Sequence, residues 1–563
     1  MLPIFRNRIR HLQRYRDIVT VFTRYGFGFM MKELGLLEWL SIPKRIFIER
    51  NKEIQNKTTG ERVRLFLEEL GPTFIKMGQL ASTRPDVFPG EIIRELEKLQ
   101  DHVPPFSTEE VHRIIEQELG AVTGAIFDHF SATPLAAASI GQVHSAVLKT
   151  GERVAVKIQR PDIKSMIETD LEILHDLAGL AVHRLEWAAR YRIADIVAEF
   201  SQSLREELDY ENEGRNSEKI ASQFKDDPHI RIPKVYGEYS SQKVLTMEYV
   251  EGIKLNEIQT LEGNGHDRKI LAERVVNAIF EQVFMGGFFH GDPHPGNILA
   301  LPEETIVFID FGMVGRLTPE MKNHFASLVI GMMRQSSDEM IKAITNMGLL
   351  PDDINMPKLR MDVDLLREKY YGVPFSQMSL GQAVNDLFSV AFRHSIRLPA
   401  DLTLLGKTLL TIEGVVEKLD PELSIISVAE PFGRRMLKER FYPKNIAEKV
   451  REHLLEYGEI LTGLPKDIKE FSAAMRKGKM KLEIVIPDLD LFFTKLKRIS
   501  NQLSFSIVLL SFSIIMTGLI IGSSLGKETP TLLWDLPTIE IGFGIAAFMF
   551  LWLLYSIFKS GRF

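Results

Sequence analysis

Three polar residues near the middle of the chain have the types and spacing of a phosphoryl-transfer site. Asp292 and Asn297 are five residues apart, and Asp310 follows thirteen residues later at the head of an Asp-Phe-Gly triplet. In such a set, one carboxylate orients or deprotonates the attacking hydroxyl, while an amide and a second carboxylate hold Mg²⁺ against the phosphates. The spacing therefore predicts a catalytic Asp292, with Asn297 and Asp310 as ligands of Mg²⁺ and ATP or ADP as the bound nucleotide.

A lysine upstream supplies a cation for this chemistry. Lys157 closes the β-branched stretch Val-Ala-Val-Lys. A lone lysine in such a place is typical of an edge strand that must stay soluble. Here, however, residues 135–141 precede it with small side chains, at the distance where protein kinases place a phosphate-covering loop. Small side chains let backbone N–H groups approach phosphates. The residues predicted to bind nucleotide are Lys157, Ala136, Ala137, Ala138 and Ser139.

The residue before Asp292 differs from that of ordinary protein kinases. The sequence reads His290-Gly291-Asp292, where protein kinases have His-Arg-Asp and several small-molecule kinases have His-Gly-Asp. The segment after Asp-Phe-Gly reaches a helical pattern almost at once, which leaves little room for an activation loop. We therefore expect no platform for a protein substrate. His290 and His294 have no third ligand at a suitable spacing, so we interpret both as supports of the loop.

Base recognition is expected in residues 245–252, between the two halves of the site. A strand that ends there would leave backbone groups of Glu248 and Val250 free to pair with an adenine edge. Met247 would lie behind them, although Met247 fits a core position equally well.

Hydrophobic periodicity predicts the elements that position these residues. They are mainly helical structure over 1–130, a hairpin of 143–148 and 154–158, a long helical run over 163–224, a strand pair at 230–235 and 243–249, and further helices after 255 interrupted by strands at 297–309. The chemistry-bearing residues then fall on or beside strands in the middle of the chain.

The composition excludes several classes of function. The chain has 563 residues, enough for two or more domains. Its 69 basic and 75 acidic residues give a net charge of −6, which argues against a dedicated nucleic-acid binder. It contains no cysteine, so disulfides, thiolate metal sites and a cysteine nucleophile are excluded.

Two uncharged apolar segments lie near the C-terminus, at residues 504–526 and 541–558. Each approaches or exceeds the roughly 20 residues that span a bilayer as a helix. A buried hairpin of a soluble domain is the alternative, although helices of soluble domains normally keep one polar face. Basic residues flank the pair on its outer sides, so the positive-inside rule predicts that both ends face the cytoplasm. The sequence thus predicts a multi-pass location in the cell membrane.

The N-terminal residues 1–16 are basic and amphipathic, with five arginines among apolar residues. This pattern fits an anionic membrane surface, and it fits a solvated charged helix equally well. No long apolar run or small-residue cleavage site follows, so the segment is not a secretory signal.

Further motifs resemble those of the UbiB/AarF family of atypical kinase-like proteins. They are a K-x-G-Q element at Lys76, Gly78 and Gln79, an alanine-rich loop at residues 136–139, and an E-x-D element at Glu207 and Asp209. The resemblance spans roughly residues 60–420. It implies that Glu213 is the acidic partner of Lys157 in catalysis.

The resemblance also implies that an N-terminal helix lies across the active site. Lys76 and Gln79 are three residues apart and would share one helix face. They would meet Glu207 and Asp209, or the bound phosphates, and so gate the cleft. On one continuous helix Glu213 is offset from the E-x-D pair and can hold the strand lysine. A plain surface helix is the alternative for the K-x-G-Q segment.

The implied fold class is α+β, a bilobal protein-kinase-like fold with a helical N-terminal extension and a C-terminal transmembrane helical hairpin. The expected regions are a helical extension (1–130), a kinase-like N-lobe with a helical insertion (131–250), a kinase-like C-lobe (251–440), a juxtamembrane helical region (441–500) and the hairpin (501–563).

The implied function is that of a membrane-anchored, Mg²⁺-dependent kinase-like ATPase that supports ubiquinone or menaquinone biosynthesis. The expected partners are the lipid bilayer, polyprenyl quinone precursors and quinone-biosynthesis enzymes. A small-molecule or lipid phosphotransferase is one alternative, favoured by His-Gly-Asp. A nucleotide-sensing scaffold is another, although the intact lysine, catalytic-loop and Asp-Phe-Gly residues argue against it.

Overall fold

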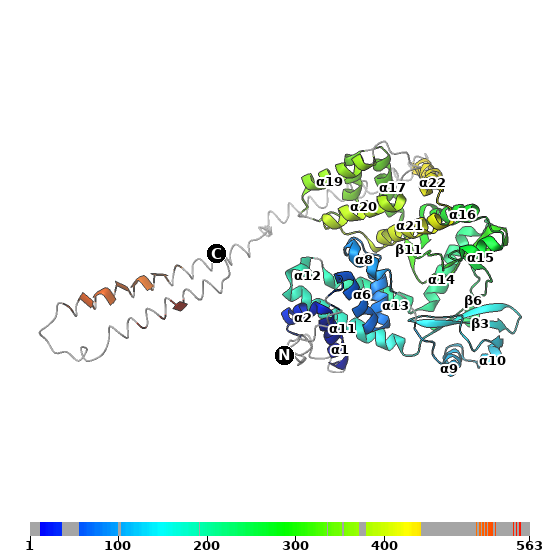
Figure 1. Ribbon diagram of the computed structural model, residues 1–563, viewed down its shortest axis with the longest axis horizontal. Helices are drawn as coiled ribbons and strands as arrows, with labels where there is room; N and C mark the ends of the chain where they lie inside the picture. The colour runs from blue at the N-terminus through cyan, green and yellow to red at the C-terminus, as the bar shows by residue number, and fades with distance from the viewer. Residues whose placement is uncertain are drawn as a thin grey trace, which may run out of the picture. The chain divides into compact units, whose positions relative to one another are not determined.

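The computed structural model describes residues 12–440 with gaps, and scattered positions nearer the C-terminus (Figure 1). The gaps are residues 37–53, 55, 100–102, 191, 335, 352–353 and 371–378, and the scattered positions lie between residues 503 and 552. The chain divides into two compact units, Met1–Glu448 and Lys449–Phe563. All elements described below belong to the first unit.

Helices occupy the described residues before the first strand. They are α1 (Leu12–Phe22), α2 (Gly28–Glu33), α6 (Thr59–Leu70), α7 (Pro72–Ala81), α8 (Gly90–Leu96), α9 (Thr108–Leu119) and α10 (Thr123–Ile126). Helix α6 begins with a capping box, because the side chains of Thr58 and Glu61 each accept the other's backbone N–H. Gly71, at a φ of 96°, then turns the chain, and Pro72 opens α7. Helix α7, which holds the K-x-G-Q element, consequently packs against α11 and α13.

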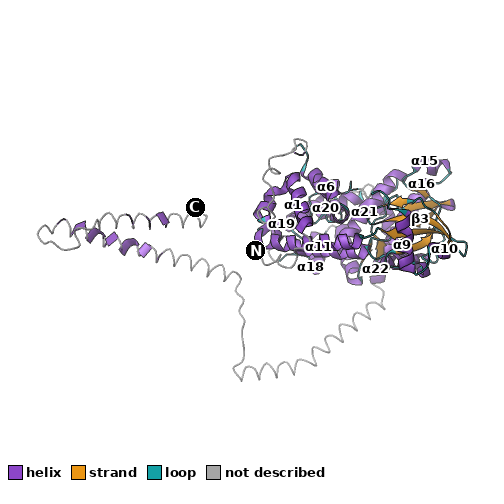
Figure 2. Cartoon of the chain, turned by 90° about the horizontal axis from the view of Figure 1, so that it is seen from below, coloured by secondary structure: helices purple, strands orange, loops and turns teal. Residues whose placement is uncertain are grey.

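A five-stranded antiparallel sheet follows, with the strands gathered at one end of the first unit beside α9 and α10 (Figure 2). Its strands are β1 (Phe127–Phe130), β2 (Ala136–Ala137), β3 (Gly141–Leu148), β4 (Arg153–Gln159) and β6 (Val244–Glu248), in the order β1-β3-β4-β6 with β2 on β3. The predicted hairpin is confirmed as β3 and β4. Val154 and Val156 are buried in the core with α9, so Lys157 lies on the opposite face.

The predicted helical run over residues 163–224 is confirmed, but Glu207 and Glu213 do not lie on one helix. The segment forms α11 (Ile163–Arg184), α12 (Glu186–Arg190), α13 (Ile193–Glu207), α14 (Tyr210–Ala221) and a 3₁₀ turn (Ser222–Phe224). The break between α13 and α14 falls at Asp209 and separates Glu207 from Glu213. The Asp209 carboxylate accepts the Glu211 N–H at 3.1 Å and caps α14. An aspartate in this position satisfies a helix donor that otherwise has no partner. Glu207 therefore ends one helix, while Glu213 belongs to the next.

The predicted strand pair at 230–235 and 243–249 is confirmed only in part, because the two segments meet at residues 234–236 and 246–248. The ladders of the two strands are made elsewhere: β5 (Ile230–Arg231) runs parallel to β10 (Thr305–Phe308), and β6 joins β4. A single bridge, Val235 to Met247, connects the two segments. The second sheet has the order β5-β10-β9-β7, with β9 (Ile298–Leu301) and β7 (Ile253–Lys254), and the predicted strands at 297–309 are confirmed as β9 and β10.

The remaining elements hold in place residues 291–297, the loop that contains Asp292 and Asn297 and is called the catalytic loop below. Strand β8 (Phe288–His290) pairs with β11 (Val314–Arg316). The helices are α15 (Ile258–Gly263), α16 (Arg268–Phe280), α17 (Pro319–Met333), α18 (Ser337–Asn346), α19 (Met356–Lys369), α20 (Leu380–Arg393), α21 (Ala400–Leu419) and α22 (Ile425–Arg440). Buried residues of α16 and α21 share one core with those of β8, β9 and β10. This core fixes the loop that contains Asp292 and the strand that leads to Asp310.

No helix in the described part of the chain is long and apolar enough to cross a membrane. Most positions of the predicted spans at 504–526 and 541–558 lie outside the described residues, as do residues 441–500 and 1–11. The described end of the basic N-terminal pattern belongs to α1. There Arg14 pairs with Asp170 at 2.7 Å and Tyr15 is buried, so this turn packs within the fold.

Two substitutions at Asp209 distinguish a helix cap from a charge that gates the cleft. Asp209→Ala removes the cap of α14 and is expected to lower the free energy of unfolding by about 1 kcal/mol. Asp209→Asn keeps a capping oxygen and should change that free energy by at most a few tenths of a kcal/mol. Urea denaturation of both variants measures the difference, and equal losses would contradict the capping role.

Candidate active site

Lys157 of β4 and Glu213 of α14 form a buried ion pair. The Lys157 Nζ lies 2.9 and 2.7 Å from the two carboxylate oxygens of Glu213. The Glu213 side chain is only 6% exposed. Helix α14 packs against β6, the neighbour of β4, and so brings its first two turns to the face of the sheet that bears Lys157. The contact expected from the sequence is present.

Asp310 completes a cluster of three charges. Its Oδ1 lies 3.8 Å from the Lys157 Nζ, and its side chain is 52% exposed, so it faces open space beside the pair. The residue has a φ of 64°, a left-handed conformation that aspartate adopts more readily than most residues. Its carboxylate accepts the Gly312 N–H at 3.3 Å. The Asp-Phe-Gly turn thus points Asp310 toward the strand lysine.

The charges of this cluster set its protonation. Burial opposes the positive charge of Lys157, but Asp310 and Glu213 together raise the pKa of Lys157 well above its ordinary value. Burial raises the pKa of Glu213, and the charge of Lys157 opposes that shift. The charge of Lys157 lowers the pKa of Asp310 to about 2, with Lys76 acting in the same direction. Lys157 is therefore a cation and Asp310 an anion at neutral pH.

His290 ties the catalytic loop to the strand before Asp310. Its Nε2 lies 3.1 Å from the Ile309 carbonyl oxygen, so that nitrogen donates. Its Nδ1 accepts the Asp292 N–H at 3.1 Å. Burial lowers the pKa of His290, which keeps the ring neutral and able to accept that hydrogen bond. His290 thus supports the loop, as the sequence predicts, and His294 accepts the Gly296 N–H.

Asn297 and Asp310 suit a magnesium ion. The Asn297 Nδ2 donates to the Asp292 carbonyl at 3.2 Å, so its Oδ1 is the atom left for a cation. The Ile309 N–H donates to the Asn297 carbonyl at 2.9 Å, which places Asn297 beside the Asp-Phe-Gly turn. An ionised carboxylate and an amide oxygen are hard ligands of the kind that Mg²⁺ uses together with phosphates and water. No cluster of three or more His, Asp or Glu suited to a metal occurs among the described residues.

Helix α21 explains the glycine in His-Gly-Asp. The Thr408 hydroxyl donates to the carbonyls of His290 and Gly291 at 3.2 and 3.3 Å. A Cβ on Gly291 would lie 2.8 Å from a methyl carbon of Leu404 and 3.0 Å from the Met313 carbonyl oxygen. A side chain at this position would require the Leu404 side chain and the residue just before β11 to move, so glycine fits here without rearrangement.

The small-residue loop is only partly open to a ligand. Ala136 and Ala137 form strand β2 on β3, and the Ala138 N–H donates to the Gly141 carbonyl at 2.8 Å. The Ala138 N–H is therefore engaged and is not free for a phosphate, contrary to the prediction. The Ser139 hydroxyl is buried and has no hydrogen-bond partner within the described part of the chain.

The backbone of Glu248 is also less available than predicted. Its N–H donates to the Lys234 carbonyl at 2.8 Å, and its carboxylate pairs with Arg231. The reason is that the chain after β5 runs beside β6 and takes up the donor. An adenine pairing through the Glu248 N–H is thus excluded in this conformation, and a role for Val250 stays a prediction.

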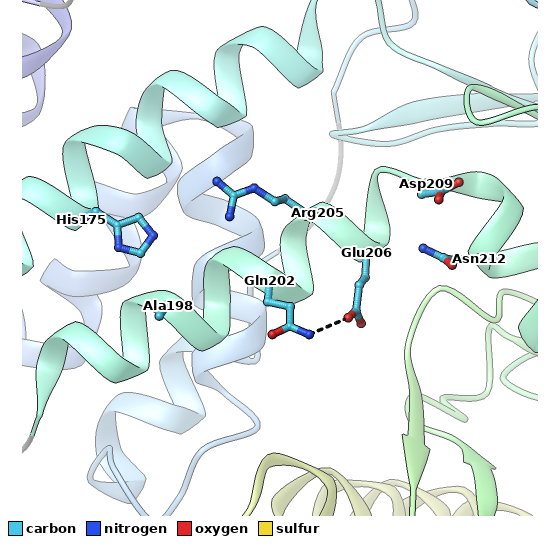
Figure 3. A pocket seen from close by; sticks show the side chains of 7 residues that line it. All are labelled: His175, Ala198, Gln202, Arg205, Glu206, Asp209 and Asn212. Atoms are coloured by element: carbon cyan, nitrogen blue, oxygen red, sulfur yellow. Dashed lines mark hydrogen bonds between the residues drawn. The ribbon is translucent and has the colours of Figure 1, made fainter. Parts of the chain in front are cut away.

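The four predicted gating residues separate into two groups. The Lys76 Nζ lies 2.6 Å from a Glu207 carboxylate oxygen, which joins α7 to the end of α13. By contrast, the Gln79 Nε2 donates to the Leu99 carbonyl at 3.3 Å. Asp209 lines an open pocket of about 440 Å³ on α13 and α14, with His175 at its other end (Figure 3). The structure thus shows Gln79 in contact with Leu99, and its predicted contact with Asp209 or with bound phosphates stays a prediction.

Two contacts with the site were not predicted from the sequence. The Lys407 Nζ of α21 lies 3.3 Å from the Asp292 Oδ1. The ring of Tyr210 lies under Lys157, with the Nζ 5.1 Å from the ring centroid. Lys407 is 115 positions after Asp292, and no local motif marks it. Tyr210 follows the E-x-D element directly, and this position is the one signal that points to it.

Comparison with known proteins identifies the family. Residues 98–344 match the ABC1 atypical kinase-like domain, residues 363–424 the UbiB helical domain and residues 487–559 the ABC1/UbiB kinase-like C-terminal domain. The chain is 32% identical over 559 residues to "Probable protein kinase UbiB" of Xanthomonas campestris, covering 97% of this chain and 100% of that one. The chain belongs to the ABC1/UbiB family of atypical kinase-like proteins. The protein of the same name from Vibrio atlanticus is 34% identical over 474 residues, 83% of this chain and 86% of that one.

Among solved structures, a Mycobacterium tuberculosis protein in complex with erythromycin is 26% identical, with a TM-score of 0.43 over 62% of this chain and 92% of that chain.

The family assignment from the sequence motifs is therefore confirmed, together with a kinase-like fold of mixed helices and sheets. The matched kinase-like domain holds the lysine strand, the catalytic loop and the Asp-Phe-Gly turn. The matched helical domain holds α20 and α21, the helix that closes against the catalytic loop.

A double-mutant cycle tests the buried ion pair. Lys157→Met and Glu213→Leu each leave one charge without its nearest partner, so each is expected to lower the free energy of unfolding by about 3 to 5 kcal/mol. The double variant should lose less than the sum, with a coupling of about 1 to 3 kcal/mol. Arg153 and Glu251, an exposed pair at 3.0 Å, provide the control and should couple by less than about 1 kcal/mol. Additive losses at Lys157 and Glu213 would contradict the pairing.

Proposed function

We propose that this protein is a Mg²⁺-dependent, kinase-like ATPase that supports isoprenoid quinone biosynthesis at a membrane. The observation that supports it best is the charge cluster of Lys157, Glu213 and Asp310 beside the loop that holds Asp292. A lysine whose pKa is raised by two neighbouring carboxylates, next to an ionised Asp310, suits the binding of a metal–triphosphate. The printed name of the relatives, "Probable protein kinase UbiB", agrees with nucleotide-dependent chemistry.

Each residue has a stated task in the proposed reaction. Lys157 binds the phosphates on the nucleotide side, and Glu213 holds its side chain in position. Asp292 orients the attacking oxygen and accepts its proton. That oxygen forms a bond to the terminal phosphorus while the bond to the bridging oxygen breaks, and ADP leaves with the electron pair. Asn297 and Asp310 would hold Mg²⁺, which offsets the negative charge of the phosphates when it is bound.

The acceptor in this proposal is water, a small molecule or a lipid. Helix α7 is joined to α13 through Lys76 and Glu207, and Lys76 is close enough to affect the pKa of Asp310. Helix α21 fills the space beside Gly291. Both features reduce the room for a folded protein substrate. They equally favour the second candidate, a small-molecule or lipid phosphotransferase.

The membrane part of the proposal rests on apolar residues of the second unit. Ile507, Leu510 and Ile514 are helical and 61 to 64% exposed, and Phe548 and Leu551 are similarly exposed. Exposed apolar side chains on a helix call for a non-aqueous neighbour. Bilayer insertion of residues 504–526 and 541–558, with both termini on the cytoplasmic side, would bring the site near polyprenyl quinone precursors and the enzymes that use them.

Two substitutions separate nucleotide binding from turnover. Asp310→Asn is expected to abolish Mg²⁺-dependent ATP binding, because it removes the charged metal ligand. Asp292→Asn should leave the dissociation constant for Mg-ATP within about threefold and lower turnover by about 10² to 10⁴. Calorimetry and phosphate release from protein in liposomes measure the two quantities, and complementation of quinone synthesis measures function in the cell. Function that persists in a variant unable to bind nucleotide would favour a scaffold.

Removal of residues 501–563 tests the anchor. The truncated protein should move from the membrane pellet to the soluble fraction, because the exposed apolar segments are gone. Deletion of residues 1–11 is the matched control and should leave the protein in the pellet. Tight membrane association of the truncated protein, after a high-salt wash, would contradict the assignment of the hairpin as the anchor.

A further inference from the structure

Helix α21 is fixed in register on the catalytic loop. Thr408 donates to the carbonyls of His290 and Gly291, and Asp401 accepts the Arg316 N–H at 2.8 Å. These contacts hold the helix at two points, seven residues apart. They leave Lys407, the residue before Thr408, beside Asp292.

Lys407 lies between two acidic groups. Its Nζ is 3.3 Å from the Asp292 Oδ1, and its side chain is 22% exposed. Burial raises the pKa of Glu97, which follows α8 in the N-terminal extension, and the charge of Lys407 is close enough to offset part of that rise. The catalytic loop itself contains no lysine or arginine, since Pro-His-Pro-Gly separates Asp292 from Asn297. The helical domain thus supplies the cation that this end of the site otherwise lacks.

The position of Asp292 determines what Lys407 can reach. The attacking oxygen must contact Asp292 and also lie about 3 to 3.5 Å from the terminal phosphorus in a reactive geometry. A flexible ammonium group at hydrogen-bond distance from Asp292 can therefore reach an oxygen of the transferred group. Lys157 is paired with Glu213 and Asp310, at the other end of the proposed triphosphate site.

We propose that Lys407 binds the terminal phosphoryl group of the nucleotide, so that α21 of the helical domain completes the active site. This inference rests on the proposed function. Lys407 exchanges its contact with Asp292 for the terminal phosphate when ATP binds, and Asp292 then becomes available to the attacking oxygen. ADP, which lacks that phosphate, leaves the ion pair with Asp292 in place.

Binding measurements with two nucleotides test the proposal without relying on turnover. The wild-type chain, Lys407→Met, Lys407→Gln and Lys407→Arg are titrated by calorimetry with Mg²⁺ and either ADP or the non-hydrolysable analogue AMP-PNP. Lys407→Met and Lys407→Gln should weaken AMP-PNP binding about tenfold or more, the effect of one charge-assisted hydrogen bond, and change ADP binding by less than about twofold. Lys407→Arg should recover most of the loss. Lys418→Met, an exposed lysine of the same helix, should change neither affinity.

The outcomes distinguish the inference from the proposed function. If the Lys407→Met and Lys407→Gln variants bind ADP and AMP-PNP more weakly by the same factor, Lys407 acts only on the structure of the loop. If these variants bind AMP-PNP as tightly as the wild-type chain or more tightly, Lys407 does not hold the terminal phosphate. Either result overturns the inference and leaves the proposed function standing. If the wild-type chain binds neither ADP nor AMP-PNP, the inference and the proposed function are both overturned.

Discussion

The site depends on keeping a lysine charged in a place where water is largely excluded. Burial opposes the charge of Lys157, and Glu213 and Asp310, which lie within 4 Å of its ammonium group, outweigh that effect. These three residues come from a strand, a helix of the insertion and the Asp-Phe-Gly turn. The electrostatic requirement therefore fixes how β4, α14 and the end of β10 meet. A break in β4 or α14 would leave a charge of this cluster without its nearest partner.

The second constraint is the packing of helices against two sides of the site. On one side, Lys76 and Glu207 join the N-terminal extension to the insertion. On the other side, Thr408 joins the helical domain to the catalytic loop. A glycine at position 291 leaves room for the helix there. Both contacts use residues outside the usual phosphotransferase set. They place α7 close to Asp310 and α21 against the loop that contains Asp292.

Local patterns predicted neighbouring elements well, and long-range pairing much less so. The hairpin of β3 and β4 and the apolar strand before Asp310 follow from the residue pattern, while the contact of Lys157 with Glu213 is expected from the family resemblance. The break at Asp209 could have been anticipated, because aspartate is a strong helix cap, but the helical period on both sides concealed it. The parallel pairing of β5 with β10 joins segments some 75 residues apart, and no turn signal marks it. For the same reason no local pattern indicates that α21 brings Lys407 to Asp292.

An experimental structure with Mg²⁺ and AMP-PNP bound tests the central claim most directly. The account predicts a metal ion coordinated by the Asn297 Oδ1 and an Asp310 carboxylate oxygen at about 2.0 to 2.1 Å, with the Lys157 Nζ on a phosphate oxygen. Nucleotide bound elsewhere on the chain, or a metal ion that contacts neither Asn297 nor Asp310, would contradict it.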